Sequence, residues 1–161
     1  MNVKVSADAG RRKRRLATGI KETLRELSIQ LSLLNHQVGG HAGLKDVDLD
    51  CLDLITRHGP IGPSALARQA GLHPATITGI LDRLERAGWV ARDRDPADRR
   101  AVLVRALPDR AGELFRLYAG MNGEMDEICA DYDEAELELL AGFLARVSDA
   151  GRRSSGRLAS G

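Results

Sequence analysis

The segment from residue 81 to residue 107 is the strongest constraint on the fold of this 161-residue chain. It begins with apolar residues at helical spacing and reaches Gly88, a residue type that often ends helices. Two short apolar stretches follow, separated by a charged turn that contains Pro96. This order of helix, strand, arginine-rich turn and returning strand indicates a winged helix. Such a unit can place its helix in the major groove of DNA and its basic hairpin on the backbone or in the minor groove.

Two short helices are predicted before the hairpin. The first covers residues 64–70 and ends at Gly71, and the second runs from residue 74 to residue 87. Proline at the first helical position and glycine beyond the last one are typical of helix boundaries. Two short helices joined by a tight glycine turn form the helix-turn-helix pattern.

The outward face of the helix over residues 74–87 carries the first set of candidate DNA contacts. Ile77, Leu81 and Leu84 point inward, with Ile80 at the edge, so the other side faces away from the core. Small residues let base edges come close, threonines can bind phosphate or touch a thymine methyl, and arginines can reach guanine or phosphate. An ordinary polar surface helix is the alternative. The predicted contacts are Ala75, Thr76, Thr78, Gly79, Arg83 and Arg86.

The hairpin tip supplies the second set. Arg94, Arg99 and Arg100 provide positive charge, whereas Asp95 and Asp98 would repel DNA if they were free. Aspartate and proline suit a turn, and Asp98 can pair with one wing arginine and leave another for the minor groove. Alternatively, these charges form internal salt bridges of an exposed hairpin, each of small energetic value.

The charge is unevenly distributed although the formal net charge is only +1. A basic run at residues 11–15 stands near the N-terminus, and an acidic stretch occupies residues 121–149. This asymmetry suits a protein with one face turned to nucleic acid and one turned away from it. We interpret the basic run as an additional phosphate contact and the acidic one as a solvated surface.

Long amphipathic helices are expected on both sides of the winged helix. Leu16, Ile20, Leu24 and Leu27 begin one apolar stripe, and two more stripes follow residue 110. One small domain cannot cover so much apolar surface, so a homodimer built from these helices is expected. The predicted organisation is a flexible basic tail (1–13), an N-terminal dimerisation helix (14–44), a winged helix-turn-helix (46–107), C-terminal dimerisation helices (108–150) and a flexible tail (151–161).

Other classes of protein are disfavoured. No apolar run approaches the roughly 18 residues of a membrane span, and no signal peptide is recognisable, so a cytoplasmic protein without a membrane partner is expected. Cys51 and Cys129 are too few for a disulfide framework. The sequence offers no nucleophile–base pair, no glycine-rich phosphate loop and no metal triad. We therefore expect neither an enzyme nor a cofactor.

The motifs resemble those of the MarR (multiple antibiotic resistance regulator) family. Residues 88–92 (GWVAR) and 95–100 (DPADRR) are similar to the wing of that family, and residues 64–67, 75–78 and 81–85 to its helix-turn-helix. The resemblance covers roughly residues 45–150. It implies a mainly α-helical, dimeric regulator that binds a palindromic operator and usually represses until a small molecule or an oxidant releases it. It further implies that Asp98 braces the wing, Arg100 enters the minor groove, Arg99 touches the backbone and Arg83 contacts phosphate.

The sequence departs from the family pattern at four places. Gly79 stands where many members have a larger polar or basic residue, which puts base readout from the middle of the helix in doubt. Gly62 replaces a capping threonine, and Pro108 begins an altered start of the next helix. His73 replaces a serine at the start of the recognition helix and is itself a candidate DNA contact.

The sequence says less about the signal that controls the protein. The resemblance implies an effector site between the dimerisation helices and the winged helix, with His36, His41, Phe115 and Tyr118 as candidate lining groups. A redox switch is a second option, although Cys51 falls in an apolar stripe and suits the core. A metal-responsive regulator is a third, although no histidine pair has the spacing of one helical turn. A winged helix that contacts protein instead of DNA is the remaining alternative.

Overall fold

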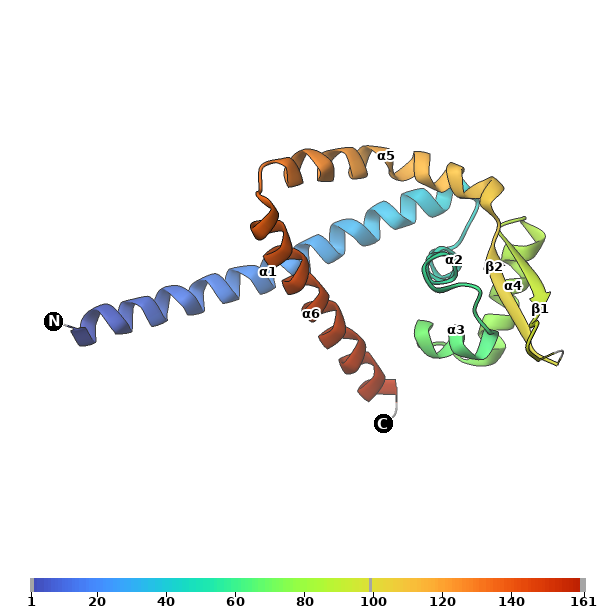
Figure 1. Ribbon diagram of the computed structural model, residues 1–161, viewed down its shortest axis with the longest axis horizontal. Coiled ribbons are helices and arrows are strands. Elements are labelled where there is room, and N and C mark those ends of the chain that lie inside the picture. The colour runs from blue at the N-terminus through green and yellow to red at the C-terminus, as the bar shows by residue number, and fades with distance from the viewer. Residues whose placement is uncertain (1, 99, 160–161) are drawn as a thin grey trace.

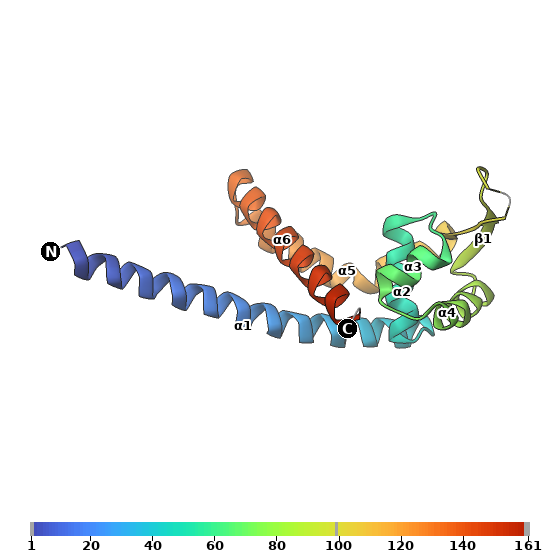
Figure 2. The ribbon, with the colours of Figure 1, turned by 90° about the horizontal axis from the view of Figure 1, so that it is seen from below.

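The computed structural model describes residues 2–98 and 100–159, and it confirms a mainly α-helical winged helix-turn-helix with long terminal helices (Figure 1). The winged helix lies at the C-terminal end of the first helix, far from the N-terminus (Figures 1 and 2). The elements are α1 (Asn2–Ala42), α2 (Asp46–His58), α3 (Pro63–Ala70), α4 (Pro74–Arg86), β1 (Val90–Arg94), β2 (Val102–Ala106), α5 (Pro108–Ala130) and α6 (Glu134–Ala159).

The helix-turn-helix forms where the sequence predicts it. Pro63 and Pro74 occupy the first turns of α3 and α4, and Gly71 adopts the left-handed conformation that ends α3. α4 buries Ile77, Ile80, Leu81 and Leu84, so Ile80 lies inside and not at the edge. These side chains pack with the buried residues of α2 and α3 into one core.

The wing is attached to this core at both ends. Gly88 has a φ of 74°, and the Trp89 N–H donates to the Leu84 carbonyl at 2.9 Å, so the chain reverses directly into β1. β1 and β2 are antiparallel, with Val90 opposite Ala106, and Ile61 adds one further pair of hydrogen bonds with Val104. The side chain of Trp89 is buried, and the Arg110 guanidinium lies 3.8 Å from the centre of its ring.

The segments predicted as flexible tails are helical in the structure over residues 2–13 and 151–159. α1 begins at Asn2 and α6 continues to Ala159. Neither segment contains proline, and alanine, arginine and lysine favour the helix, although Gly10, Gly151 and Gly156 each weaken it. α1 continues through Gly39-Gly40 and ends at Ala42, where Gly43 takes the left-handed turn.

The terminal helices contribute little to the buried core. Among the described residues, every core side chain falls between Val38 and Val104. α5 has no buried residue, and the apolar side chains of α1 and α6 that formed the predicted stripes are largely exposed, including Leu16 at 61% and Leu144 at 50%. No helix in the described ranges is long and apolar enough to cross a membrane.

Cys51 is part of the core, with no exposed surface. Burial, followed by the charges of Asp50 and Asp48, raises the pKa of its thiol to about 11. Because the thiolate is the reactive form, such a thiol is a poor redox sensor at neutral pH. Cys129 lies on α5 and is half-buried.

We expect Cys51 to react with a thiol reagent far more slowly than Cys129 in the folded protein. With a pKa of about 11, roughly one Cys51 thiol in a thousand is ionised at about pH 8. The ordinary pKa of a cysteine thiol is 9.0. The contribution of Cys51 to the stability of the folded state is therefore complete below pH 9 and is lost as the pH rises from 9 to about 11. Mass-spectrometric labelling tests the first point, and melting curves of the protein and Cys51→Ala across this pH range test the second. Equal labelling rates of Cys51 and Cys129 would contradict the burial of the Cys51 thiol.

Candidate nucleic-acid interface

The outward face of α4 presents most of the predicted contacts. Ala75, Thr76 and Thr78 are exposed, and Arg86 is exposed at the end of the helix. The Thr78 hydroxyl donates to the Pro74 carbonyl at 3.3 Å, which leaves its oxygen free to accept from another partner. This face is small and polar at its leading end and basic at its trailing end.

His73 caps α4. The Ala75 N–H donates to His73 Nδ1 at 3.2 Å, so Nδ1 acts as the acceptor that serine or aspartate oxygens supply in other helices. A neutral ring with an accepting Nδ1 carries its proton on Nε2. His73 can therefore cap the helix and still offer an N–H donor to a phosphate or a base.

Arg83 has an additional role that sequence analysis did not foresee. Its Nε and Nη2 donate to the two carboxylate oxygens of Asp48 at 3.1 and 2.6 Å. The Asp48 side chain is only 4% exposed, whereas that of Arg83 is 39% exposed. The ion pair joins α2 to α4, and it raises the pKa of Arg83 chiefly through the hydrogen bonds to Asp48. Arg83 is thus oriented by Asp48 and is not an independent surface cation.

Gly79 leaves room for this arrangement. A Cβ at this position would lie 3.7 Å from Arg83 Nη1, the one guanidinium nitrogen that Asp48 does not engage. This distance is an ordinary van der Waals contact, so a small side chain would also fit at this position and the arrangement of Arg83 does not require glycine.

Arg92 of β1 bridges two carboxylates of α4. It donates to Asp82 at 2.6 Å and to Glu85 at 2.7 Å. Asp82 lies on the outward face, where a free carboxylate would repel DNA. The pairing offsets part of this negative charge and ties the wing to the helix.

The wing tip uses its aspartates to build turns. Asp95 accepts from the Ala97 N–H at 2.8 Å, and Asp98 accepts from the Arg100 N–H at 2.9 Å. Neither carboxylate forms an ion pair with the described arginines of the tip, so Asp98 braces the wing through the backbone. Arg94 and Arg100 are exposed and have no ion pair within the described part of the chain, and Arg99 lies outside the described residues.

The predicted effector residues divide into two groups. Phe115 and Tyr118 line a cleft of about 530 Å³ between α1, α2 and α5, together with Leu31, Asn35, Asp50 and Asp53. His36 instead pairs with Asp46 at 3.0 Å, and His41 Nδ1 lies 2.8 Å from the Gln37 carbonyl. Within residues 2–98 and 100–159, no three side chains of His, Cys, Asp or Glu gather as a metal site requires.

The cleft has a negative electrostatic character. Burial, followed by the charges of Asp46 and Asp53, raises the pKa of Asp50. Burial, followed by Asp53 and Asp50, raises the pKa of Tyr118, whose hydroxyl donates to Asn35 Oδ1 at 2.8 Å. Arg57 is the cation of the cleft, and it is paired with Asp53 at 2.8 Å. Among the described residues no ion pair involves Asp50, which lies against the apolar wall of the cleft.

Sequence analysis missed Asp48 and Arg92. Asp48 had a recognisable signal, because residues 48, 52 and 55 fall on one face of α2 and a carboxylate among leucine and isoleucine needs a cationic partner. Arg92 had none, because its two partners lie seven and ten residues earlier, on another element.

We expect the Asp48–Arg83 pair to contribute asymmetrically to stability. Arg83→Met strands a buried carboxylate and should lower the free energy of unfolding by about 2–3 kcal/mol, a value reduced from that of a fully buried pair because Arg83 is partly exposed. Asp48→Asn should cost less, about 1 kcal/mol, because Arg83 can hydrate. Urea denaturation measures both.

Asp53→Asn on the same helix is the control. Its pair with Arg57 is exposed at both ends, so the change should remain below about 0.5 kcal/mol. Equal losses in the free energy of unfolding for Asp48→Asn and Asp53→Asn would show that the buried ion pair stabilises the fold no more than the exposed one.

Comparison with known proteins agrees with this geometry. The MarR family model matches residues 44–102. An uncharacterized HTH-type transcriptional regulator of Bacillus subtilis, YcgE, is 34% identical over 119 residues, covering 73% of this chain and 77% of the relative. The HTH-type transcriptional regulator FarR of Neisseria gonorrhoeae is 32% identical, covering 68% and 77%.

A solved structure extends the match to the terminal helices. A crystal structure of MarR has 26% sequence identity and a TM-score of 0.55, over 83% of this chain and 98% of that one. These matches and the winged helix described above concern the same residues. The chain belongs to the MarR family, and it is a transcriptional regulator with a DNA-binding winged helix and not an enzyme.

Proposed function

We propose that this regulator works as a homodimeric repressor that binds a palindromic operator and is released by a small molecule. The observation that carries the proposal is the pairing of an exposed, polar α4 face with a wing tip whose Arg94 and Arg100 have no ion pair among the described residues. A dimer that covers a promoter with these groups would exclude polymerase. It would act in the cytoplasm, where the operator DNA is.

Dimerisation is supported by the apolar surface of the terminal helices. Most of the stability of a helix in a protein comes from packing of its apolar face, yet α1, α5 and α6 contribute little to the core of their own chain. A second copy related by a two-fold axis would cover the same stripes on both chains. We accordingly assign residues 14–44 and 108–150 to the dimer and residues 46–107 to DNA.

The DNA contacts are assigned to α4 and the wing. Thr76 and Ala75 suit the approach to base edges, and Arg86 and Nη1 of Arg83 suit phosphates. Arg100 and Arg94, held at the tip by the Asp95 and Asp98 turns, suit the minor groove. Recognition helices about 34–36 Å apart would match the half-sites of a palindrome.

We assign the effector to the cleft lined by Phe115 and Tyr118. Its unpaired Asp50 and its negative character favour an aromatic or aliphatic molecule that carries a positive charge, since the apolar wall takes the hydrocarbon and Asp50 takes the cation. α2 supports this assignment, because it connects the cleft with the recognition helix. Asp50 faces the cleft, and Asp48, two residues earlier, pairs with Arg83 of α4.

A titration against DNA tests the regulator. The protein is titrated with its own upstream promoter fragment and with a scrambled fragment at two salt concentrations. Arg100→Ala should weaken promoter binding by about 1–3 kcal/mol without a change in thermal stability. Arg152→Ala on α6 is the control and should leave affinity unchanged. Equal affinity for both fragments, or no effect of Arg100→Ala, would argue for a winged helix that serves another partner.

The charge preference of the cleft is tested on the protein–promoter complex with a matched pair of probes, phenethylamine and phenylacetate. The amine should release the DNA at lower concentration, and Asp50→Asn should remove the difference between the probes. Glu113→Gln on α5, outside the cleft, should leave it unchanged. Release by phenylacetate alone would reverse the assigned ligand class.

A further inference from the structure

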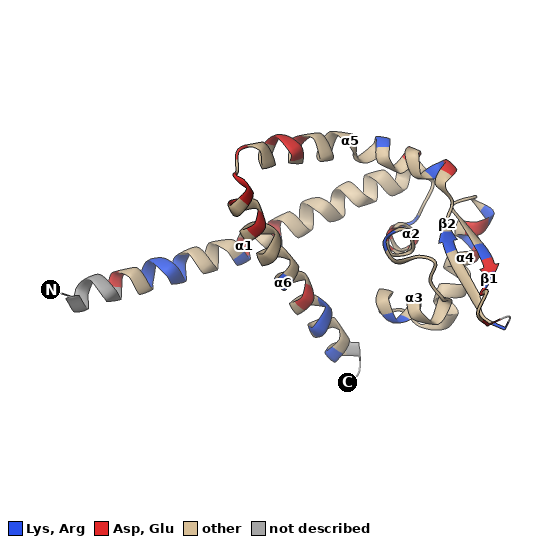
Figure 3. Ribbon diagram, viewed as in Figure 1, with Lys and Arg blue, Asp and Glu red and all other residues tan. Residues whose placement is uncertain are grey.

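Five consecutive cations, Arg11 to Arg15, form a basic segment near the N-terminal end of α1 (Figure 3). All five side chains are exposed, and only Arg11 has an ion pair within the described residues, a weak one of 3.9 Å to Asp8. Like charges three and four residues apart destabilise a helix, so this segment needs a negative partner.

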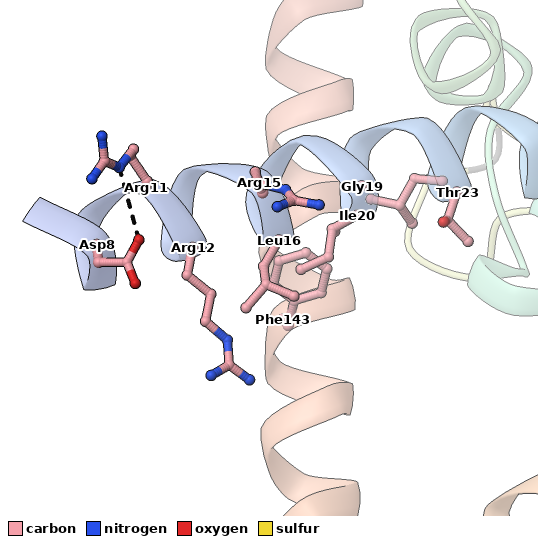
Figure 4. Close-up of a pocket in the computed structure, with 10 residues that line it drawn as sticks. Asp8, Arg11, Arg12, Arg15, Leu16, Gly19, Ile20, Thr23 and Phe143 are labelled. Carbon is pink, nitrogen blue, oxygen red and sulfur yellow. Dashed lines mark ion pairs between the residues drawn. The ribbon is translucent and has the colours of Figure 1, made fainter.

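The partner must also be apolar. Arg11, Arg12 and Arg15 line, together with Leu16 and Ile20, a cleft of about 1010 Å³ that Phe143 of α6 also borders, with Arg11 directed away from Arg12 (Figure 4). We call this surface the basic face. A surface that fits the basic face would have a row of apolar side chains with carboxylates beside it.

The α5–α6 connection has that chemistry. Between residues 121 and 138 the chain has eight carboxylates and no lysine or arginine. Asp133 and Glu136 cap α6 by hydrogen bonding to each other's backbone N–H groups. Glu124, Glu127 and Asp131 share one side of α5 by spacing and have no ion pair among the described residues. We call these three residues the acidic face.

An apolar stripe runs beside the acidic face. Met125, Ile128 and Tyr132 are 44%, 54% and 44% exposed. The acidic face and this stripe therefore match the cations and the leucine–isoleucine pair of the basic face. No ion pair connects the two faces within the described part of one chain.

DNA bound to the winged helix of the same chain is a poorer partner for the basic segment. Arg15 precedes the end of α1 at Ala42 by 27 residues, which in a helix corresponds to about 40 Å. The segment points away from α4 and the wing (Figures 1 and 2). Within one copy of the chain, the geometry does not support the phosphate contact that the sequence analysis expects for this segment.

We propose that the basic face of α1 docks on the acidic face of a second copy of this chain. The proposal rests on the homodimer proposed above and specifies which surfaces meet in it. Two-fold symmetry makes the contact twice, with α1 of each copy laid across the end of α5 of the other. The charge pairs lie at the rim and choose the partner and its orientation, whereas the apolar side chains supply the buried area.

Charge exchange tests this contact directly. One variant carries Arg11→Glu, Arg12→Glu and Arg15→Glu, and the other carries Glu124→Lys, Glu127→Lys and Asp131→Lys. Each alone brings like charges together and should weaken the homodimer by at least about tenfold at roughly 0.1 M salt. Sedimentation equilibrium measures the dissociation constant, and circular dichroism checks the helix content.

Mixing the two variants should restore a dimer. In the heterodimer both contacts are attractive again, acidic α1 on basic α5 and basic α1 on acidic α5. We expect at least about tenfold preference for the heterodimer over either homodimer, and a loss of this preference at high salt. Statistical mixing, or unchanged homodimers, would overturn the proposal even if one variant were partly unfolded.

A matched control places the same charge change on the other side of α1. Arg14, Lys21 and Arg25 are exposed and lie opposite the basic face by helical spacing. Their triple change to Glu should leave dimerisation within about twofold of the wild-type protein.

DNA titration of the same variants, at concentrations where each is dimeric, separates this proposal from the proposed function. Loss of promoter affinity with an intact dimer would assign the basic segment to DNA and overturn the docking. Normal dimers that bind no promoter DNA, including the wild type, would reject the operator function and leave the docking intact.

Discussion

The structure depends on where its apolar side chains lie: those of the winged helix are buried in one core, whereas those of the terminal helices are largely exposed. All core side chains of the described residues fall between Val38 and Val104, although α1, α5 and α6 account for more than half of the chain. Burial of apolar area is the main favourable contribution to folding, so the long helices gain stability only by packing on another surface. The winged helix is complete in one copy, and in the proposed dimer the spacing of two such units would be set by the terminal helices.

Within the winged helix, ion pairs set the position of the groups that face DNA. Asp48 on α2 orients Arg83, and Arg92 on β1 pairs with both Asp82 and Glu85. Arg110 adds a third link, since its Nη1 donates to the Ala87 carbonyl at 2.7 Å and its guanidinium covers Trp89. The recognition helix is thus held at its middle, along its outer side and at its end by side chains from three other elements. α2 is the element common to this support and to the cleft with Phe115 and Tyr118.

The sequence predicts those features that depend on a few neighbouring residues, such as caps and turns. It does not predict contacts between residues that are distant in the chain. Gly71, Gly88 and the prolines at helix starts mark the boundaries of α3 and α4, because turn and cap geometry is decided within a few residues. The roles of Asp48 and Arg92 depend on partners in other elements. The predicted tails failed for another reason: a charged, glycine-containing segment such as residues 8–15 is compatible with both coil and helix, and its state depends on what covers it. His36 and His41 were assigned to the cleft on position alone, and each faces a neighbour of its own instead.

The small net charge of +1 conceals three regions with different functions. The five cations at residues 11–15 and the eight carboxylates at residues 121–138 partly cancel one another, and both groups lie on terminal helices. At the winged helix, Asp95 and Asp98 accept backbone N–H groups of the turn and Asp82 of α4 pairs with Arg92, so Arg94 and Arg100 are left without an ion pair among the described residues. A near-zero total therefore does not argue against a DNA-binding protein. What decides the interaction is the charge left unpaired at each surface, and here it is positive where the fold places DNA.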